Sequence, residues 1–450
     1  MVKIDMSIRN ITIKKTIKKT IKKIPGFRNL VYKIEIMEKE LEGYKHQNLL
    51  IARKSIDYRL QLKAINNEKI NVVFVCHRPQ VWETLHSIYD AMKQDESFKV
   101  SIVAIPNKKE LPNLWLNHEE YESEGAEEFW KEYGCINGYN YETKEWFDLE
   151  KLEPDYVFFQ QPYNIARCEA YKSWNVAQYS KICYLNYFSP VSFAEVYDES
   201  TPGDFLKDIA FYFTQNPRDH EYIVDRYKRL GYEDTTYVMT GYPRYDGLKR
   251  IKGSSDIWSD NEHKKFRLVW TPRWTTNEGN CHFFEFKDKL IEFCDKNDIE
   301  LVFRPHPQAF LEWNTTGEFD ENKQKELRKQ FDANENLHLD ETAGYLDLFY
   351  SSDCLLTDPS SIVYDYFLTG NPIIYCCGNQ VDDACELLRD GLYEENEWDK
   401  IKIILENLIE ENDELKEVRE KVMESAYYIN NKGAGYEIKV FIKNNARGKK

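Results

Sequence analysis

The sequence lacks the features that mark secreted and membrane-spanning proteins. It contains no apolar run of about 18 residues, so we expect no helix that crosses a bilayer. The amino-terminal region is basic but has no apolar core followed by a small-residue cleavage site, so we do not interpret it as a secretory signal. The ten cysteines form no CxxC pair and show no zinc-site spacing with histidine, which favours reduced thiols in a cytosolic protein.

The common cofactor motifs are absent as well. No Asp-x-Asp occurs, so the sequence does not support a divalent metal held in the manner of many nucleotide-sugar transferases. It also has no GxGxxG dinucleotide fingerprint, no GxxxxGKS/T loop and no GxSxG elbow. We therefore expect no metal and no cofactor. Phosphate charge would have to be met by arginines, hydroxyls and helix dipoles.

The charge is distributed unevenly. The chain has 61 Lys and Arg against 77 Asp and Glu, and the net charge of −16 argues against a nucleic-acid-binding protein as a whole. Between Met1 and Ile34, ten basic residues stand against one acid, Asp5, so this segment carries +9 and the remainder −25. The basic character is therefore confined to the amino terminus.

The segment 11–24 repeats a four-residue unit that places isoleucines on one helical stripe with lysines on both flanks. Such a helix can lie in the interface of an anionic membrane, where each Lys contributes about 1 kcal/mol. The alternative is a solvated or partner-binding helix. The residues expected to contact the membrane are Ile13, Lys14, Ile17, Lys18, Ile21 and Lys22. A second, mixed-charge helix is expected from about Val31 to Ile65, as a spacer or a self-association element.

Buried strands that alternate with helices begin at Ile70 and predict doubly wound α/β domains. We divide the chain into a helical segment (1–69), an amino-terminal Rossmann-like domain (70–248), a linker (249–265) and a carboxyl-terminal Rossmann-like domain (266–450). The last of these is expected to end with an acidic helix from Asp399 to about Tyr428. The predicted architecture is two Rossmann-like domains that face each other across a cleft.

Candidate phosphate ligands follow several of these strands. An apolar strand reaches Asp358, which we expect to cap a helix with Pro359 in its first position and Ser360 and Ser361 in its first turn. Ordinary capping is the alternative for these residues. Arg304 and His306 follow a second strand, and a structural loop histidine is the alternative for His306. Two further strand ends carry Arg244 and Arg273, so the pattern favours an anion-binding site.

Four motifs together resemble the CDP-glycerol glycerophosphotransferase family, which includes teichoic acid primases and polymerases. They are Gly241-Tyr-Pro-Arg-Tyr-Asp246, Thr271-Pro-Arg-Trp274, Arg304-Pro-His-Pro307 and Thr357-Asp-Pro-Ser-Ser-Ile-Val-Tyr-Asp365. The resemblance implies a GT-B-type fold with a CDP-alcohol in the carboxyl-terminal domain. It also implies peripheral attachment to the cytoplasmic face of the cell membrane and a lipid-linked or polymeric acceptor, such as a teichoic acid or capsule-like precursor.

The resemblance also implies roles for individual residues. Ser360 and Ser361 would hold the donor phosphates and Asp365 its ribose. Four further side chains would surround the pyrophosphate, namely Arg244, Arg273, Arg304 and His306. An acceptor hydroxyl would attack the β-phosphorus and displace CMP.

The family's usual Trp-His-Gly histidine is missing, because 184–190 has no histidine. We expect His77, directly after the first strand, to act as the base, with Glu83 and Glu195 as the next candidates. A structural cap is the alternative for His77. Two other functions stay open, a GT-B glycosyltransferase that uses a nucleotide-sugar and a membrane-anchored scaffolding subunit without catalysis.

Overall fold

The computed structural model describes most of the chain. The described residues are 27–108, 120–123, 126–187, 202–246, 255–259, 262, 264–277, 279–342, 344–377, 387–428 and 432–448. The predicted membrane-contacting residues Ile13, Lys14, Ile17, Lys18, Ile21 and Lys22, the base candidate Glu195 and most of the linker lie outside them.

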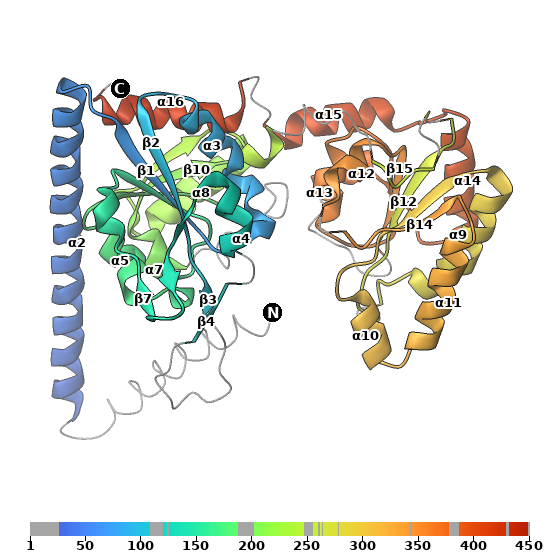
Figure 1. Cartoon of the computed structure of the whole chain (residues 1–450), viewed down its shortest axis with the longest axis horizontal. Coiled ribbons are helices and arrows are strands. Elements are labelled where there is room, and N and C mark those ends of the chain that lie inside the picture. Colours follow the sequence, from blue (N-terminus) through green and yellow to red (C-terminus); the bar gives the residue numbers. More distant parts are fainter. Residues whose placement is uncertain are drawn as a thin grey trace.

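The amino-terminal domain is built on a parallel sheet of seven strands (Figure 1). Their order across the sheet is β11-β10-β9-β8-β1-β2-β5. The strands are β1 (Ile70–Cys76), β2 (Phe98–Ala104), β5 (Ile136–Asn137), β8 (Tyr156–Phe159), β9 (Lys181–Leu185), β10 (Ile209–Thr214) and β11 (Thr236–Met239). Two short antiparallel pairs, β3 (Asn107–Lys108) with β4 (Tyr121–Glu122) and β6 (Tyr139–Asn140) with β7 (Glu145–Trp146), lie outside it.

A second parallel sheet, of six strands, forms the carboxyl-terminal domain. Its order is β14-β13-β12-β15-β16-β17. The strands are β12 (Arg267–Thr271), β13 (Glu300–Phe303), β14 (Leu337–Leu339), β15 (Cys354–Thr357), β16 (Ile373–Tyr375) and β17 (Tyr393–Glu394). The expectation of two doubly wound α/β domains is confirmed.

Helices make the central strands of both sheets inaccessible to solvent, as their short apolar runs predict. Every residue of β8, β9, β12, β13 and β15 is buried. The helices of the first domain are α3 (Glu83–Lys93), α4 (Ala126–Trp130), α5 (Ser173–Val176), α7 (Gly203–Leu206) and α8 (Pro217–Arg229). Those of the second are α9 (Phe283–Asn297), α10 (Ala309–Thr315), α11 (Glu321–Asp332), α12 (Leu346–Tyr350), α13 (Ile362–Phe367), α14 (Trp398–Ile409) and α15 (Lys416–Ala426).

The chain does not end in the single acidic helix that we expected over 399–428. The structure has two helices there, α14 and α15, because the chain turns at Glu411 with a positive φ of 61°. A third helix, α16 (Ala434–Ala446), then returns to the amino-terminal domain and lies against α3 (Figure 1). A side chain at Gly435 would meet the backbone carbon of Ser87 at 2.5 Å, so this close approach requires glycine. The last helix of the expected carboxyl-terminal domain (266–450) therefore packs on the first domain.

A long helix, α2 (Phe27–Ile65), precedes the first sheet and confirms the helix expected from Val31 to Ile65. Its second half packs against the amino-terminal domain through Leu49, Ile56 and Leu60. Polar contacts reinforce this packing, since Arg59 and Lys63 both bond the buried carboxylate of Asp155. Within the described residues, no helix combines the length and the apolar character needed to cross a membrane.

Candidate functional site

In each sheet, successive strands are added on one side of the first strand and then on its other side, and the boundary between these two series is the switch point. In the first sheet this switch point lies between β1 and β8, and in the second it lies between β12 and β15. Ligands of open α/β sheets bind outside the carboxyl ends of the strands at such points. The predicted site residues follow these strand ends, His77 in the first domain and Arg273, Ser360 and Ser361 in the second.

Asp358 joins the two strand ends of the second switch point. Its Oδ2 accepts hydrogen bonds from the backbone N–H groups of Arg273 (2.8 Å) and His282 (3.0 Å). Its Oδ1 lies 2.6 Å from Nδ1 of His282. Asp358 therefore does not cap the following helix, contrary to expectation. It fixes the loop after β12 against the loop after β15.

The phosphate-binding candidates Ser360 and Ser361 lie in that second loop. Helix α13 begins at Ile362, later than predicted, with Ser361 in the N-cap position and without a side-chain cap bond. Ser360 is half-buried and Ser361 is exposed. Both hydroxyls therefore stand at the carboxyl edge of the sheet, before the helix.

Arg273 and His306 come together at this edge. Nη1 of Arg273 donates to the carbonyl of Pro359 at 2.9 Å, and the next residue, Trp274, stacks on His306 with ring centroids 5.4 Å apart. Burial and the charge of Arg273 lower the pKa of His306. Because the backbone N–H of Gln308 donates to Nδ1 of His306, the neutral ring carries its proton on Nε2. His306 thus offers a neutral N–H donor beside a guanidinium.

Arg244 and Asp365 form an interdomain ion pair in this structure. Arg244 lies in the turn after β11, and its Nη2 is 2.8 Å from Oδ2 of Asp365 on α13. The hydroxyl of Tyr345 contacts both, at 2.5 Å from Asp365 and closer to Arg244. Burial opposes the charge of Arg244, but Asp365 and Tyr345 raise the pKa of the guanidinium. The predicted contacts of Arg244 and Asp365 with a donor remain predictions.

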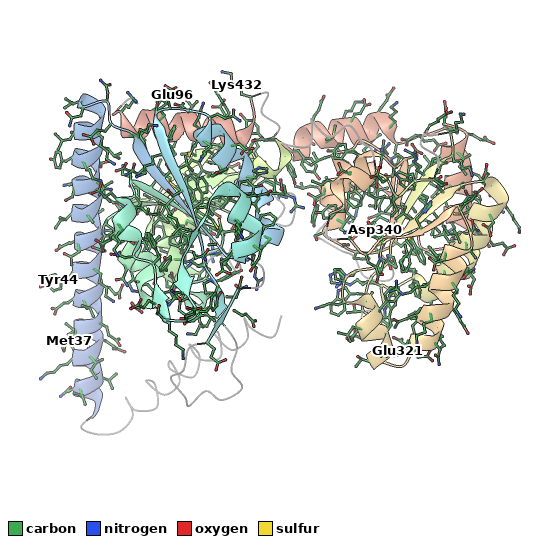
Figure 2. All side chains as sticks on the ribbon, in the orientation of Figure 1. Met37, Tyr44, Glu96, Glu321, Asp340 and Lys432 are labelled. Atoms are coloured by element: carbon green, nitrogen blue, oxygen red, sulfur yellow. The ribbon has the colours of Figure 1, made fainter. Side chains whose placement is uncertain are left out.

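Arg304, the third arginine expected at the pyrophosphate, is engaged with its own domain. It forms an ion pair with Asp340 and donates to the carbonyl of Thr342 at 2.8 Å. Figure 2 labels Asp340 within the carboxyl-terminal domain. The guanidinium carbon also lies 5.5 Å from the ring centroid of Tyr345, so Arg304 adjoins the interdomain pair. Tyr345 and Asp340 carried no motif signal in the sequence.

His77 occupies the first switch point but is a poor base. Its side chain is 4% exposed, and its Nε2 lies 2.7 Å from Oε1 of Gln161. Burial and the charge of Arg167 lower the pKa of His77 to about 3. Its backbone N–H donates to Gln160. The structure thus favours the alternative of a structural role over the predicted catalytic one.

Glu83 is the described alternative to His77. It is exposed at the start of α3, and His86 and the charge of Arg244 contribute to lowering its pKa. Helix α3 packs against the turn that carries Arg244. The lowered pKa of Glu83 keeps its carboxylate ionised at neutral pH.

His282 is a site residue that we did not predict. It lies directly before α9, and burial disfavours its charged form, but the bonds and charge of Asp358 raise its pKa. Among the described residues, His282, Asp358 and Cys376 form a group whose ligand atoms lie within 4.8 Å of one another and could hold a metal ion. Both oxygens of Asp358 already serve hydrogen bonds, so we assign this group to the support of the loops after β12 and β15. The sequence feature that could have indicated His282 is its position ten residues after Pro272.

Two Rossmann-like domains with this topology define a GT-B-type fold, and comparison with solved structures agrees. The chain is similar to a variant of the wall teichoic acid polymerase TagF, with a TM-score of 0.50 and 15% identity over 92% of this chain and 98% of that one. It is also similar to a UDP-GlcNAc 2-epimerase from Neisseria meningitidis, with a TM-score of 0.53 and 14% identity over 83% of this chain and 98% of that one. At these identities the likeness shows the fold.

A family model matches part of the sequence. Residues 208–382 match the family model described as CDP-Glycerol:Poly(glycerophosphate) glycerophosphotransferase. This match confirms the resemblance read from the four motifs. The matched segment contains all the predicted donor residues, whereas His77 lies outside it.

Curated relatives match over a similar number of residues. The minor teichoic acid biosynthesis protein GgaB of Bacillus subtilis is 26% identical over 157 residues, which is 32% of this chain and 16% of that protein. The teichoic acid ribitol-phosphate polymerase TarK of Staphylococcus aureus is 24% identical over 157 residues, 32% of this chain and 28% of that protein. The chain thus spans less than a third of the length of these relatives.

The interdomain ion pair can be tested by a double-mutant cycle. We expect Arg244→Gln and Asp365→Asn each to lower the free energy of unfolding by about 3 kcal/mol, because each leaves a buried charged partner behind. The double variant should lose less free energy of unfolding than the two single variants lose together. The difference, which is the coupling energy of the pair, should be about 1–3 kcal/mol when measured by urea unfolding. The exposed pair Arg229 and Asp225 on α8 is the matched control, with a coupling of at most about 1 kcal/mol. Equal coupling energies for the two pairs would contradict a buried ion pair between Arg244 and Asp365.

Burial of neutral His77 predicts a pH dependence of stability. Its pKa of about 3 lies below the ordinary value of 6.5, so between these values the unfolded chain binds the extra proton. Stability should fall as the pH decreases from 6.5, by about 1.4 kcal/mol per pH unit from this group. His77→Gln keeps an N–H donor without titrating. Urea unfolding at pH 7 and pH 5 should show a loss about 2 kcal/mol larger in the parent, and equal losses would show that His77 is accessible to protons.

Proposed function

We propose that the protein transfers a polyol phosphate from a CDP-alcohol to a membrane-linked precursor of a teichoic acid or capsule-like polymer and releases CMP. The observation that carries the proposal is the position of the predicted donor residues. All seven lie within the segment that matches the glycerophosphotransferase family, and Arg273, His306, Ser360 and Ser361 follow three adjacent parallel strands. This grouping of a guanidinium, a neutral imidazole N–H and two hydroxyls suits a pyrophosphate.

The proposed reaction is a displacement at phosphorus. The acceptor oxygen attacks the β-phosphorus and forms the new P–O bond. The bond from this phosphorus to the oxygen of CMP breaks, and CMP leaves with the electron pair. Arg273 and the Nε2–H of His306 would donate to phosphate oxygens as their charge changes, so that positioning and electrostatics supply most of the rate.

The hydroxyl proton of the acceptor has to pass to a base. Of the described candidates, Glu83 suits this role better than His77, because it is exposed and ionised whereas His77 is buried. The strand ends around His77 carry the amides of Gln160, Gln161 and Asn186, and the buried guanidinium of Arg167 donates to the carbonyl of Gln161. Amides suit the hydroxyl groups of a polyol or sugar chain end, so we place the acceptor on this domain.

The function is tested by supplying the purified chain with CDP-glycerol, CDP-ribitol and UDP-sugars together with a lipid-linked acceptor. We expect release of CMP from a CDP-alcohol and none of UDP from the sugars. Ser360→Ala with Ser361→Ala should weaken CDP-alcohol binding at least about tenfold, because two donors to phosphate are lost while the strand and helix core stay intact. Calorimetry of folded variants measures this change.

The matched control is Ser425→Ala on α15, where the hydroxyl bonds only a carbonyl of its own helix. It should bind the donor as the parent does. Release of UDP instead of CMP would replace our proposal by a glycosyltransferase, and unchanged donor binding in the serine variant would place the phosphate elsewhere. In the same assay, Glu83→Gln should lower turnover about 10²-fold or more with donor binding preserved, whereas parental turnover would exclude Glu83 as the base.

Attachment to the cytoplasmic face of the membrane is proposed from the lysine-rich repeat at 11–24. We expect the full chain to bind vesicles that contain anionic lipid and to be released by high salt, because lysine contacts with anionic headgroups are screened. Removal of residues 1–24 should abolish binding in a flotation assay. Neutral vesicles are the control, and equal binding with and without the segment would contradict the proposal.

A further inference from the structure

Helix α2 carries two apolar stripes, and the amino-terminal domain covers one of them. Residues Leu49, Ile56 and Leu60 belong to the covered stripe. The other stripe is exposed along the helix and consists of Leu30, Ile34, Met37, Leu41, Tyr44, Ile51, Tyr58, Leu62 and Ile65. Figure 2 shows Met37 and Tyr44 on α2, at the edge of the molecule. A soluble domain rarely leaves such a long apolar surface in contact with water.

The exposed stripe follows the heptad spacing of a coiled coil. Steps of three and four residues connect its members when Asn48 and Ser55 are included, and the pattern continues from Leu30 to Ile65. The a positions are Ile34, Leu41, Asn48, Ser55 and Leu62, and the d positions are Leu30, Met37, Tyr44, Ile51, Tyr58 and Ile65. A repeat of 3.5 residues sustained over five heptads is typical of a helix that pairs with another helix over its length. On a helix of 3.6 residues per turn, the two stripes lie roughly 130° apart.

We propose that the exposed stripe of α2 binds the same stripe of a second copy of this chain, as a parallel two-stranded coiled coil. Charge complementarity supports this occupant. In a parallel pair each g position lies beside the following e position of the other helix. This places Lys33 beside Glu38 of the second copy and Glu40 beside Lys45 of the second copy, and all four residues are exposed. These two contacts are between opposite charges. The remaining charged pair, Lys54 beside Arg59 of the second copy, is of like charge, but Arg59 already bonds the carboxylate of Asp155 in its own domain.

An asparagine in the stripe supports the same register. Asn48 is exposed at an a position near the middle, where an in-register parallel pair places it against Asn48 of the second copy. An asparagine at an a position specifies register and strand number, because its amide then finds a partner in the same amide of the other helix. The covered stripe remains on its own domain, so the pairing displaces none of the contacts of Arg59 and Lys63 with Asp155. Both helices would begin at the same end, next to two lysine-rich segments, which would strengthen attachment to an anionic surface.

The test is the mass of the full chain, measured by sedimentation velocity over a range of concentrations. We expect a dimer in the parent. Ile34→Glu with Leu41→Glu should raise the dissociation constant at least about 100-fold, because carboxylates would be buried without a partner. The control is Ile36→Glu with Tyr32→Glu, on the same helix but outside the stripe. Ile34 and Ile36 are each 41% exposed, so the variants are matched and neither should impair folding.

A charge exchange tests the orientation. Glu40→Lys should weaken the dimer, because it brings two ammonium groups together across the interface. Adding Lys45→Glu to the same chain should restore it, because the two positions would again carry opposite charges. In an antiparallel pair, e positions lie beside e positions and g positions beside g positions. Positions 40 and 45 would then not meet, and Lys45→Glu should not restore the dimer.

Each result decides one part of the proposal. A parent that stays monomeric at every concentration overturns it. A dimer that both glutamate pairs weaken equally overturns the stripe as the interface, and absence of rescue overturns the parallel arrangement.

Discussion

The turn after β11 joins the two domains, and the arrangement of the candidate site depends on it. Arg244 pairs there with Asp365 on α13, and two residues later Asp246 accepts the first backbone N–H groups of α16, from Ala434 and Gly435, both at 2.7 Å. The same carboxylate accepts the hydroxyl of Ser87 on α3. One short segment thus fixes α13 from one domain and α16 from the other. Because α13 follows Ser360 and Ser361 directly, the ion pair of Arg244 with Asp365 also holds the loop that carries these serines next to the first domain.

Much of the fold was predictable because its signals are local. Each central strand is a short apolar run between turn residues, and each of the arginines expected at the site follows a strand end. Parallel strands put these ends on one edge, so the grouping of Arg273, His306, Ser360 and Ser361 could be inferred from position alone. The pairing of Arg244 with Asp365 could not, because 121 residues separate them and both had a plausible role toward a ligand.

The remaining differences have physical causes of the same kind. Asp358 followed by proline reads as a helix cap, yet its carboxylate bonds the backbone of the neighbouring loop, a competition that only the folded chain decides. His77 follows a strand as a base would, but its burial and the charge of Arg167, which comes from a separate loop, lower the pKa of its imidazole. The return of α16 depends on a contact between Gly435 and Ser87 that has no sequence pattern. On α2, the residues of the covered and the exposed apolar stripes alternate along the sequence, so the heptad spacing of the exposed stripe is difficult to recognise without the structure.

The two switch points differ in their polar groups. The carboxyl edge of the second sheet carries guanidinium and imidazole groups around Asp358, whereas the edge of the first carries the amides of Gln160 and Gln161 and the guanidinium of Arg167 around the buried His77. Under the proposed function, a pyrophosphate bound in the second domain would meet Arg273 and His306. The hydroxyl that attacks its phosphorus would then come from the amino-terminal domain. Because the ion pair of Arg244 with Asp365 joins α13 to the turn after β11, the interaction that holds the two serines near the first domain would also bring the two substrates together.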